Sequence, residues 1–462
     1  MAAYRSFKHQ FICMKSVYNL FACCGILLVL ASCSVQRKIG RMAGDILLED
    51  STLASAHIGI SIFDQVSAKY LYNYQGDKYF VPASNTKIFT LYAGMKYLGD
   101  SIVGLHYTEN DTAIFITPTG DPTLLHRDFK IHPVATFLRS AKKPVYINAS
   151  NWDTDALGSG WAWNDFNAYY MPERSAFPAY GNVIRWVQEK TGEAPADDTQ
   201  FDQTVSIYSI PEIDWDVRFN PSSNEQRFDV QRNWSQNLFR ISQGEEIKRE
   251  IEVPFITNGI ASSVELINEN LDRNIAIITN ASPGSAHEKT IYSQHADSLF
   301  RPLMYRSDNF YAEQVLLMVS QKLLGKMNTA LITDSLLKTD LSALQQKPRW
   351  ADGSGLSRYN LFTPQSFVTI LGMMHKEFGM ERLTSIFATG GSGTLGNFYQ
   401  EIRGHIYAKT GTLSGVVALS GYLLTRKNKM LYFSVLVNNH RGNAVEIRRK
   451  VEAFLVGIYD RY

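Results

Sequence analysis

Apolar residues change their spacing several times along this chain, and each spacing predicts a kind of element. Residues 56–62 alternate between apolar and small or polar positions, which is typical of a strand. From residue 86 to residue 95 apolar positions recur at helical spacing, and Pro82 and Ser84 mark the start of that helix. Further helices are predicted at 311–324, 364–378 and 444–459, and strands at 405–412, 416–424 and 430–437. Helices packed around an antiparallel sheet make an α+β unit.

The middle of the chain has a different pattern, with short strands and turns. Residues 112–116 and 204–208 are predicted strands, and a periodic run at 183–187 is predicted as a helix that Gly192 ends. A chain of 462 residues is long for one core, so about two to three folded units are expected. We therefore predict one or two inserted β-rich domains that interrupt the α+β domain. The predicted division is 34–104 and 285–462 for the α+β domain and 105–284 for the insertion.

Composition narrows the chemistry that the chain can perform. All four cysteines lie within the first 33 residues, which excludes a disulfide framework, a cysteine nucleophile and a thiolate metal site from the remainder. The ten histidines show no metal-ligand spacing, so we predict neither a metal nor a cofactor. The formal net charge is +2, which does not indicate a nucleic-acid partner.

Three short motifs, each weak alone, occur in order along the chain. They are Ser84-Asn85-Thr86-Lys87, Ser307-Asp308-Asn309 and Lys409-Thr410-Gly411. Ser84 and Lys87 are three residues apart at a helix start, so they share one face, close enough for proton transfer. The unpaired N–H groups and the dipole at that end suit an oxyanion. Gly411 lies beside a predicted strand, where a bare glycine lets a substrate backbone approach closely. This combination fits a serine acyl-transfer site in which lysine is the base.

Other copies of the same patterns lack this structural setting. Ser140-x-x-Lys143 is predicted at a solvated helix end, and Ser335-x-x-Lys338 on an ordinary surface helix. A third copy, Lys190-Thr191-Gly192, closes the helix predicted at 183–187, where the glycine is a helix stop. For the second motif, a helix cap before Tyr311 remains an alternative to a catalytic role.

The three motifs together resemble those of penicillin-binding proteins and β-lactamases. Four further stretches extend the resemblance from about residue 51 to the C-terminus. They are Gly120-Asp121-Pro122-Thr123-Leu124, Gly160-Trp161-Ala162-Trp163-Asn164-Asp165, Asp352-Gly353-Ser354-Gly355-Leu356-Ser357-Arg358 and Ala408-Lys409-Thr410-Gly411-Thr412-Leu413. With them the chain resembles the low-molecular-mass class C penicillin-binding proteins, the D-alanyl-D-alanine carboxypeptidase/endopeptidase family. The resemblance implies a penicillin-binding/β-lactamase-like catalytic domain that acts on peptidoglycan stem peptides and that β-lactams inhibit covalently.

The resemblance and the chemistry of the residue types assign the same roles to the first two motifs. Ser84 is expected to attack the carbonyl of the penultimate D-alanine and form an acyl-enzyme. Lys87 is expected to be the general base, which requires a neutral amine and hence burial or a cationic neighbour such as Lys409. Ser307 is expected to pass a proton to the leaving amine, and Asn309 to orient Lys87 and the substrate amide.

Strand and loop residues are expected to bind the substrate. Lys409 supplies positive potential near the substrate carboxylate, and the hydroxyl groups of Thr410 and Thr412 are donors to it. The backbone N–H groups of Ser84 and Thr412 form the oxyanion hole. Asp352 and Ser354 are predicted to shape a turn near the site.

Two charged residues match family positions that contact the ionic side chain of a stem-peptide diamino acid. They are Asp165 and Arg358, and a substrate side chain with both an amine and a carboxylate favours one partner of each sign. A surface salt bridge is the alternative for this pair. Trp161 and Trp163 are predicted to be packing residues rather than residues that stack on substrate.

Two other function classes remain open at this point. A β-lactamase or esterase would use the same acylation machinery but needs a group that speeds deacylation, and no Glu-x-x-x-Asn segment lies where class A β-lactamases carry theirs. A non-catalytic wall-binding module is the other alternative. The sequence does not decide between carboxypeptidase and endopeptidase activity, and it gives no oligomeric state.

The N-terminus predicts a lipoprotein signal peptide over residues 1–33. Basic residues precede an apolar stretch at 20–30 that is too short to span a bilayer. It ends in Leu30-Ala31-Ser32-Cys33, which resembles the bacterial lipobox, so Cys33 is the predicted lipidation site and the membrane contact. Ser34 follows the cysteine, and that resemblance implies the outer membrane, with the enzyme in the periplasm. A signal peptide cut elsewhere and a transmembrane anchor are the alternatives.

Overall fold

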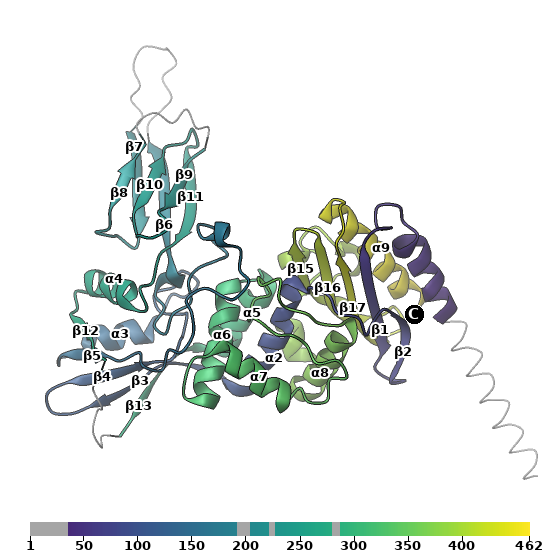
Figure 1. Cartoon of the computed structure of the whole chain (residues 1–462), viewed down its shortest axis with the longest axis horizontal. Helices are drawn as coiled ribbons and strands as arrows, with labels where there is room; N and C mark the ends of the chain where they lie inside the picture. Colours follow the sequence, from purple (N-terminus) through teal and green to yellow (C-terminus); the bar gives the residue numbers. More distant parts are fainter. Residues whose placement is uncertain (1–35, 192–203, 221–226, 280–286) are drawn as a thin grey trace, which may run out of the picture.

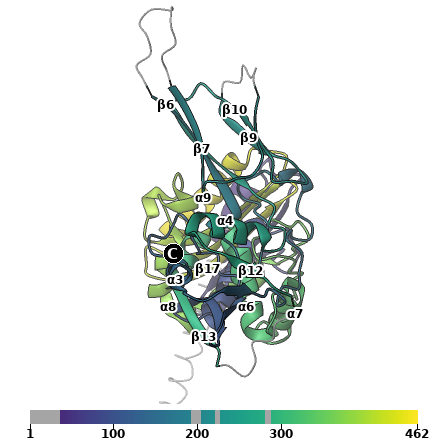
Figure 2. The same cartoon turned by 90° about the vertical axis from the view of Figure 1, so that its left-hand side faces the viewer.

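The computed structural model describes residues 36–191, 204–220, 227–279 and 287–462. Figure 1 shows a body of helices and sheet that contains the N-terminal part of the described chain, before β3, and its C-terminal part, after β13, and two β regions formed by the residues between these parts. In the turned view of Figure 2, the strands between residues 183 and 254 stand away from the rest of the molecule. The predicted α+β fold with inserted β regions is confirmed.

The body is built on a six-stranded sheet in the order β14-β15-β16-β17-β1-β2, and every neighbouring pair is antiparallel. The central strands β16 (Val416–Leu424) and β17 (Met430–Asn438) are buried along almost their whole length, because helices cover both faces of the sheet. The edge strand β2 (Lys69–Tyr74) is partly exposed. The remaining strands are β1 (His57–Asp64), β14 (Ala388–Thr389) and β15 (Ile406–Leu413).

Most helices pack in one core on the same face of this sheet. They are α2 (Lys87–Tyr97), α5 (Ala296–Tyr305), α6 (Asn309–Leu324), α7 (Thr329–Lys338) and α8 (Pro364–Ile386). Helix α2 lies among α5, α6 and α8 and is therefore buried all round, from Lys87 to Met95. The opposite face is covered by α9 (Ala444–Arg461) and the helical residues 36–43. The helices predicted at 86–95, 311–324, 364–378 and 444–459 are all present.

The first inserted region is a five-stranded sheet in the order β12-β5-β4-β3-β13. Helices α3 (Pro133–Ser140) and α4 (Ala261–Leu271) share its core. The strands are β3 (Ser101–Glu109), β4 (Ile114–Pro118), β5 (Val145–Ile147), β12 (Ile275–Ile277) and β13 (Lys289–His295). Because β13 pairs with β3, the inserted sheet reaches from Ser101 to His295, which is four residues before and eleven residues after the expected range 105–284.

The second inserted region is nested inside the first and consists of two small sheets in the orders β11-β6-β7 and β8-β10-β9. Aromatic and branched side chains, among them Trp186, Phe228 and Phe239, form its core. Its strands are β6 (Val183–Thr191), β7 (Thr204–Ile210), β8 (Val217–Phe219), β9 (Asp229–Arg232), β10 (Phe239–Ser242) and β11 (Lys248–Pro254).

One predicted helix in this region is wrong. Residues 183–187 belong to strand β6, which pairs with β7 on one side and β11 on the other. The run contains two valines, an isoleucine and a tryptophan, which favour a strand when partners are available. Lys190 and Thr191 end this strand, and Gly192 lies outside the described residues. Of the other two copies of the serine–lysine pattern, one has Ser140 at the end of α3 with Lys143 beyond it, and the other, Ser335 and Lys338, lies on α7, as predicted.

Within the described ranges, no helix has the length and apolar character needed to cross a membrane. The apolar stretch at 20–30 and Cys33 lie outside those ranges.

Candidate active site

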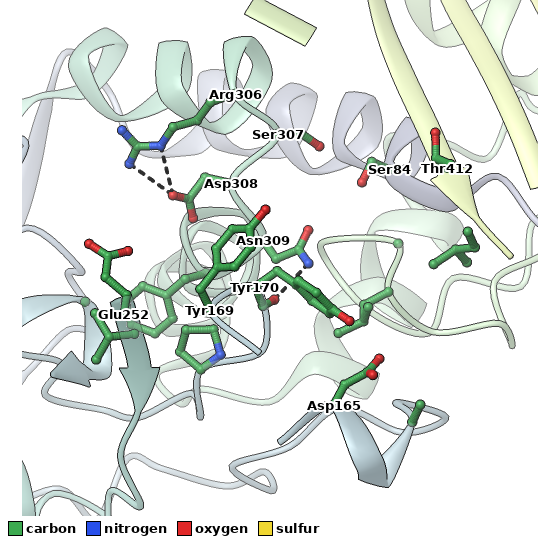
Figure 3. A pocket seen from close by; sticks show the side chains of 18 of the residues that line it. Ser84, Asp165, Tyr169, Tyr170, Glu252, Arg306, Ser307, Asp308, Asn309 and Thr412 are labelled. Atoms are coloured by element: carbon green, nitrogen blue, oxygen red, sulfur yellow. Dashed lines mark hydrogen bonds and ion pairs between the residues drawn. The ribbon is translucent and has the colours of Figure 1, made fainter. Parts of the chain in front are cut away.

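The fold brings the three motifs to one place. Ser84 lies on the short helix η2 (Ala83–Thr86) that leads into α2, Ser307 and Asn309 lie at the start of α6, and Lys409 lies on β15. Lys87 Nζ is 3.0 Å from Ser84 Oγ and 2.6 Å from Asn309 Oδ1. Lys409 Nζ donates to Ser307 Oγ at 2.8 Å. Figure 3 shows Ser84, Ser307, Asn309 and Thr412 around the same space.

Lys87 is fully buried, and its contacts suit a general base. Burial lowers its pKa to about 8, although Asp352, Glu313 and Asp308 favour the charged form. Its Nζ also donates to the carbonyl of Ser354 at 2.7 Å. A neutral amine has two hydrogens and one lone pair. If the hydrogens go to Asn309 and Ser354, the lone pair is left for the hydroxyl proton of Ser84.

Two buried carboxylates hold the loop that accepts from Lys87. Asp352 accepts hydrogen bonds from the backbone N–H groups of Gly355 and Ser357, so the predicted turn is confirmed. Glu313 accepts from the N–H of Ser354 at 2.7 Å and pairs with Arg174 at 3.2 Å. Burial raises the pKa of Glu313. We did not identify Glu313 in the sequence, because one glutamate within an apolar helical run has no motif around it.

The second motif is held in an unusual backbone conformation. Asp308, not Ser307 or Asn309, caps α6 by accepting from Tyr311 N at 2.9 Å. The capping alternative therefore does not apply to Ser307 and Asn309, whose side chains bind Lys409 and Lys87. Ser307 has a φ of 65°, which is strained for a residue other than glycine. Its surroundings must hold it there.

Those surroundings come from the inserted region. Arg306 forms ion pairs with both Asp128 and Asp308, and Tyr311 Oη donates to Asp128 Oδ2 at 2.8 Å. Asn309 Nδ2 donates to the carbonyl of Tyr170 at 2.9 Å. No local pattern indicates the contacts of Asp128 and Tyr170, since these residues are more than a hundred positions away from Arg306 and Asn309 in the sequence.

Strand β15 lies directly against the turn that carries Ser84. A Cβ on Gly411 would be 2.6 Å from the carbonyl oxygen of Pro82, so the glycine is required by the chain's own backbone. We had predicted that the missing side chain makes room for a substrate. Gly355, with a φ of 82°, has the same role on the other side, where a Cβ would be 1.9 Å from Ala83 O. Ser84 is thus fixed between two glycines.

Lys409, Thr410 and Thr412 of strand β15 have different surroundings. Lys409 is fully buried, and its pKa is held well below its usual range by burial, with Lys87 and Arg448 adding to the effect. Thr412 lines the cleft and accepts a hydrogen bond from Arg448 of α9. Thr410 is buried and lines a separate small cavity with Arg448, so the structure does not bring it to the cleft wall.

A cleft of about 940 Å³ runs from Ser84 to the inserted regions. Asp165 and Arg358 both line it, as do Tyr169 and Tyr170. Arg358 donates to the carbonyl of Ser414 at 2.9 Å. Burial raises the pKa of Tyr170, and Asp165 adds to that effect. The two predicted recognition residues therefore face one cleft with opposite charges.

The two tryptophans near Asp165 differ. Trp161 is partly buried and donates from Nε1 to Asp352 at 2.9 Å, so its packing role is confirmed. Trp163 is 72% exposed, so the packing prediction is wrong for this residue. The alternating Trp-Ala-Trp sequence does not show which ring turns outward.

Known proteins match this chain over nearly its whole length. The family model of the D-Ala-D-Ala carboxypeptidase 3 (S13) family matches residues 43–460. The chain is 24% identical over 437 residues to the D-alanyl-D-alanine carboxypeptidase of Actinomadura sp. (strain R39), covering 87% of this chain and 81% of that protein. Penicillin binding protein 4 (dacB) from Haemophilus influenzae is similar in structure, with a TM-score of 0.68, 20% identity and coverage of 91% of this chain and 98% of that one. A β-lactam complex of that protein matches with a TM-score of 0.67 and 19% identity over the same shares of the two chains.

The pKa of Lys87 predicts how acylation by penicillin depends on pH. The rate constant should rise as the pH rises toward about 8 and then level off, because only the neutral amine can take the proton of Ser84. Stopped-flow acylation rates across this range test it. Lys87→Ala should be slower by roughly 10²–10⁴-fold. Lys409→Arg replaces the second buried amine with a group that does not titrate in this range, so the inflection should remain. An inflection that disappears with this change would assign the titration to Lys409 instead.

Arg448 is predicted to prepare Thr412 for a carboxylate. An arginine only donates, so its hydrogen bond leaves the Thr412 hydroxyl proton free for the substrate's terminal carboxylate. Arg448→Ala should lower kcat/KM about tenfold for a peptide with a free C-terminal carboxylate, which is ~1.4 kcal/mol. The same peptide as an amide should be affected much less. Arg441→Ala, at an exposed position in the preceding loop, is the control. Equal losses for acid and amide would contradict the prediction.

Proposed function

The chain belongs to the D-Ala-D-Ala carboxypeptidase 3 (S13) family of serine peptidases, and from this premise we propose that it cleaves D-alanyl-D-alanine bonds of peptidoglycan stem peptides through an acyl-enzyme on Ser84. The observation that carries the assignment is the contact of Ser84 with a buried lysine of lowered pKa. A second buried lysine, Lys409, holds Ser307 on the other side of the same space.

The reaction follows from these contacts. Lys87 takes the hydroxyl proton as Ser84 Oγ bonds to the carbonyl carbon of the penultimate D-alanine. The N–H groups of Ser84 and Thr412 stabilise the resulting oxyanion. Ser307 donates its hydroxyl proton to the departing amine as the C–N bond breaks, and the proton that Lys87 took from Ser84 replaces it, which leaves Lys87 neutral. Lys87 then takes a proton from the water that attacks the ester carbon. As the ester C–O bond breaks, Lys87 returns that proton to Ser84 Oγ, so the free enzyme is regenerated.

The cleft supports the assignment of a third-residue subsite. Asp165 and Arg358 line the same cleft as Ser84 and offer one charge of each sign. A stem-peptide diamino acid has an ammonium and a carboxylate in its side chain, so both groups would find a partner. We propose these two residues as its contacts. The wall-binding alternative is disfavoured, because it gives no reason to bury two lysines beside two serines.

We also propose that the enzyme is anchored by a lipid on Cys33 to the periplasmic side of the bacterial envelope, at the outer membrane. The lipobox-like segment Leu30-Ala31-Ser32-Cys33 supports this. An anchor would keep the enzyme near its polymeric substrate.

Penicillin tests the acyl-enzyme directly. Intact mass of a protein lacking residues 1–33 should show one stable penicillin adduct, and Ser84→Ala should show none, because the substitution removes the hydroxyl group that contacts Lys87. An adduct that disappears as penicillin is consumed would indicate a β-lactamase. No adduct on the wild type at any time would contradict the mechanism. Release of D-alanine from a D-Ala-D-Ala peptide completes the test.

Lipidation predicts the fate of the full-length chain in a bacterial host. The wild type should fractionate with membranes and incorporate labelled palmitate, and Cys33→Ser should do neither, because the serine hydroxyl is not a lipidation acceptor. Cys23→Ser is the matched control and should leave both results unchanged. Palmitate incorporation by Cys33→Ser would refute the assignment of the site.

A further inference from the structure

Large aromatic side chains are exposed beside the segment of the cleft wall that contains Ala162 and Asp165. Trp163 is 72% exposed, Tyr169 is 69% exposed and Trp234 is 51% exposed. Trp163 and Trp234 come from different segments, yet their ring centroids are 6.1 Å apart in an edge-to-face arrangement. Exposed aromatic groups of this size favour aggregation and are usually associated with binding.

Buried polar contacts fix the two segments to each other. Asn167 and Arg232 exchange two hydrogen bonds, from Arg232 N at 3.0 Å and from Asn167 Nδ2 at 3.2 Å. Arg232 is only 5% exposed, and its guanidinium donates to the carbonyls of Pro254 and Asn233. Phe166 packs edge-to-face against Trp234 at 4.9 Å. The exposed rings are therefore supported from beneath by a rigid framework, which preorganises their outer surfaces.

This aromatic pair continues the wall of the cleft. Ala162 and Asp165, on either side of Trp163 in the sequence, both line it. In the proposed function the scissile bond lies at Ser84 and the third stem residue lies at Asp165. Only two more residues, at ~3.3–3.6 Å each, separate that residue from the sugar to which the peptide is attached. Trp163 lies on the same short helix as Asp165, η3 (Trp163–Asp165), so it is within reach of the sugar end of the substrate.

We propose that Trp163 and Trp234 bind a sugar ring of the peptidoglycan glycan strand. Aromatic faces stack on the C–H faces of sugar rings, and each indole N–H adds a hydrogen-bond donor for a hydroxyl or acetamido group. The site rests on the proposed function and deepens it: the enzyme recognises a stem peptide that is still attached to its glycan. Binding energy from this remote end lowers the barrier at Ser84 only if both ends are engaged together.

The test compares two substrates that differ only in the sugar. One is a D-Ala-D-Ala stem peptide attached to its disaccharide, and the other is the same peptide without sugar. For each enzyme, kcat/KM for the peptide with the disaccharide is divided by kcat/KM for the peptide without sugar. In the double variant Trp163→Ala/Trp234→Ala this ratio should fall about tenfold, toward one. The ratio for the double variant Trp163→Phe/Trp234→Phe should lie between those of the wild type and the double alanine variant, since a smaller aromatic face remains. Tyr292→Ala, an exposed aromatic residue on β13 outside the cleft lining, should leave the ratio unchanged.

A binding measurement separates failure of this proposal from failure of the proposed function. Calorimetric titration of the Ser84→Ala variant with a soluble oligomer of N-acetylglucosamine should show binding. The triple variant Ser84→Ala/Trp163→Ala/Trp234→Ala should show none. If the wild type cleaves neither substrate, the peptidase function fails while this titration still decides the sugar site. An unchanged substrate ratio together with no sugar binding would overturn the proposal. So would a change of oligomeric state on removing the tryptophans, which would identify a protein interface instead.

Discussion

Burial of the Lys87 amine is the constraint on which the rest of the active site depends. A buried ammonium is costly unless it is paired, and a fully paired one would be too weak a base at neutral pH. Here burial outweighs the attraction of Asp352, Glu313 and Asp308, and the pKa falls to about 8. Arg174 pairs with Glu313 and so weakens that attraction. The balance of these buried charges sets the basicity of the group that activates Ser84.

The inserted regions are part of the active site rather than additions to it. Their residues Asp128 and Tyr170 bind Arg306 and Asn309, on either side of a serine with strained backbone. That strain is sustained only because several contacts determine the conformation together. The same regions form the far wall of the cleft, so substrate recognition and the geometry of the second motif are linked through one structural unit.

Local signals in the sequence predicted the body of the fold and the three motifs well. The positions of α2, α6, β15 and β16 were predicted correctly, because each element is long and rich in apolar residues. Residues 183–187 were misassigned because a five-residue apolar run fits both periods, and partner strands decide between them. Glu313, Arg448 and Asp128 act through contacts with distant segments, which no local pattern records. Trp161 and Trp163 look alike in sequence, and only the fold separates the buried ring from the exposed one.

The nesting of the chain has a consequence for how the enzyme comes into being. Ser84 and Lys409 are separated by 325 residues (409 − 84), and strand β1 pairs with β17, which is near the other end of the chain. Such non-local pairing makes folding slow, because long loops must close before the contacts form. A chain still emerging from the ribosome contains the nucleophile but neither β15 nor its lysine. The nascent chain is therefore inert during synthesis, and hydrolytic capacity arises only when the last strands join the sheet.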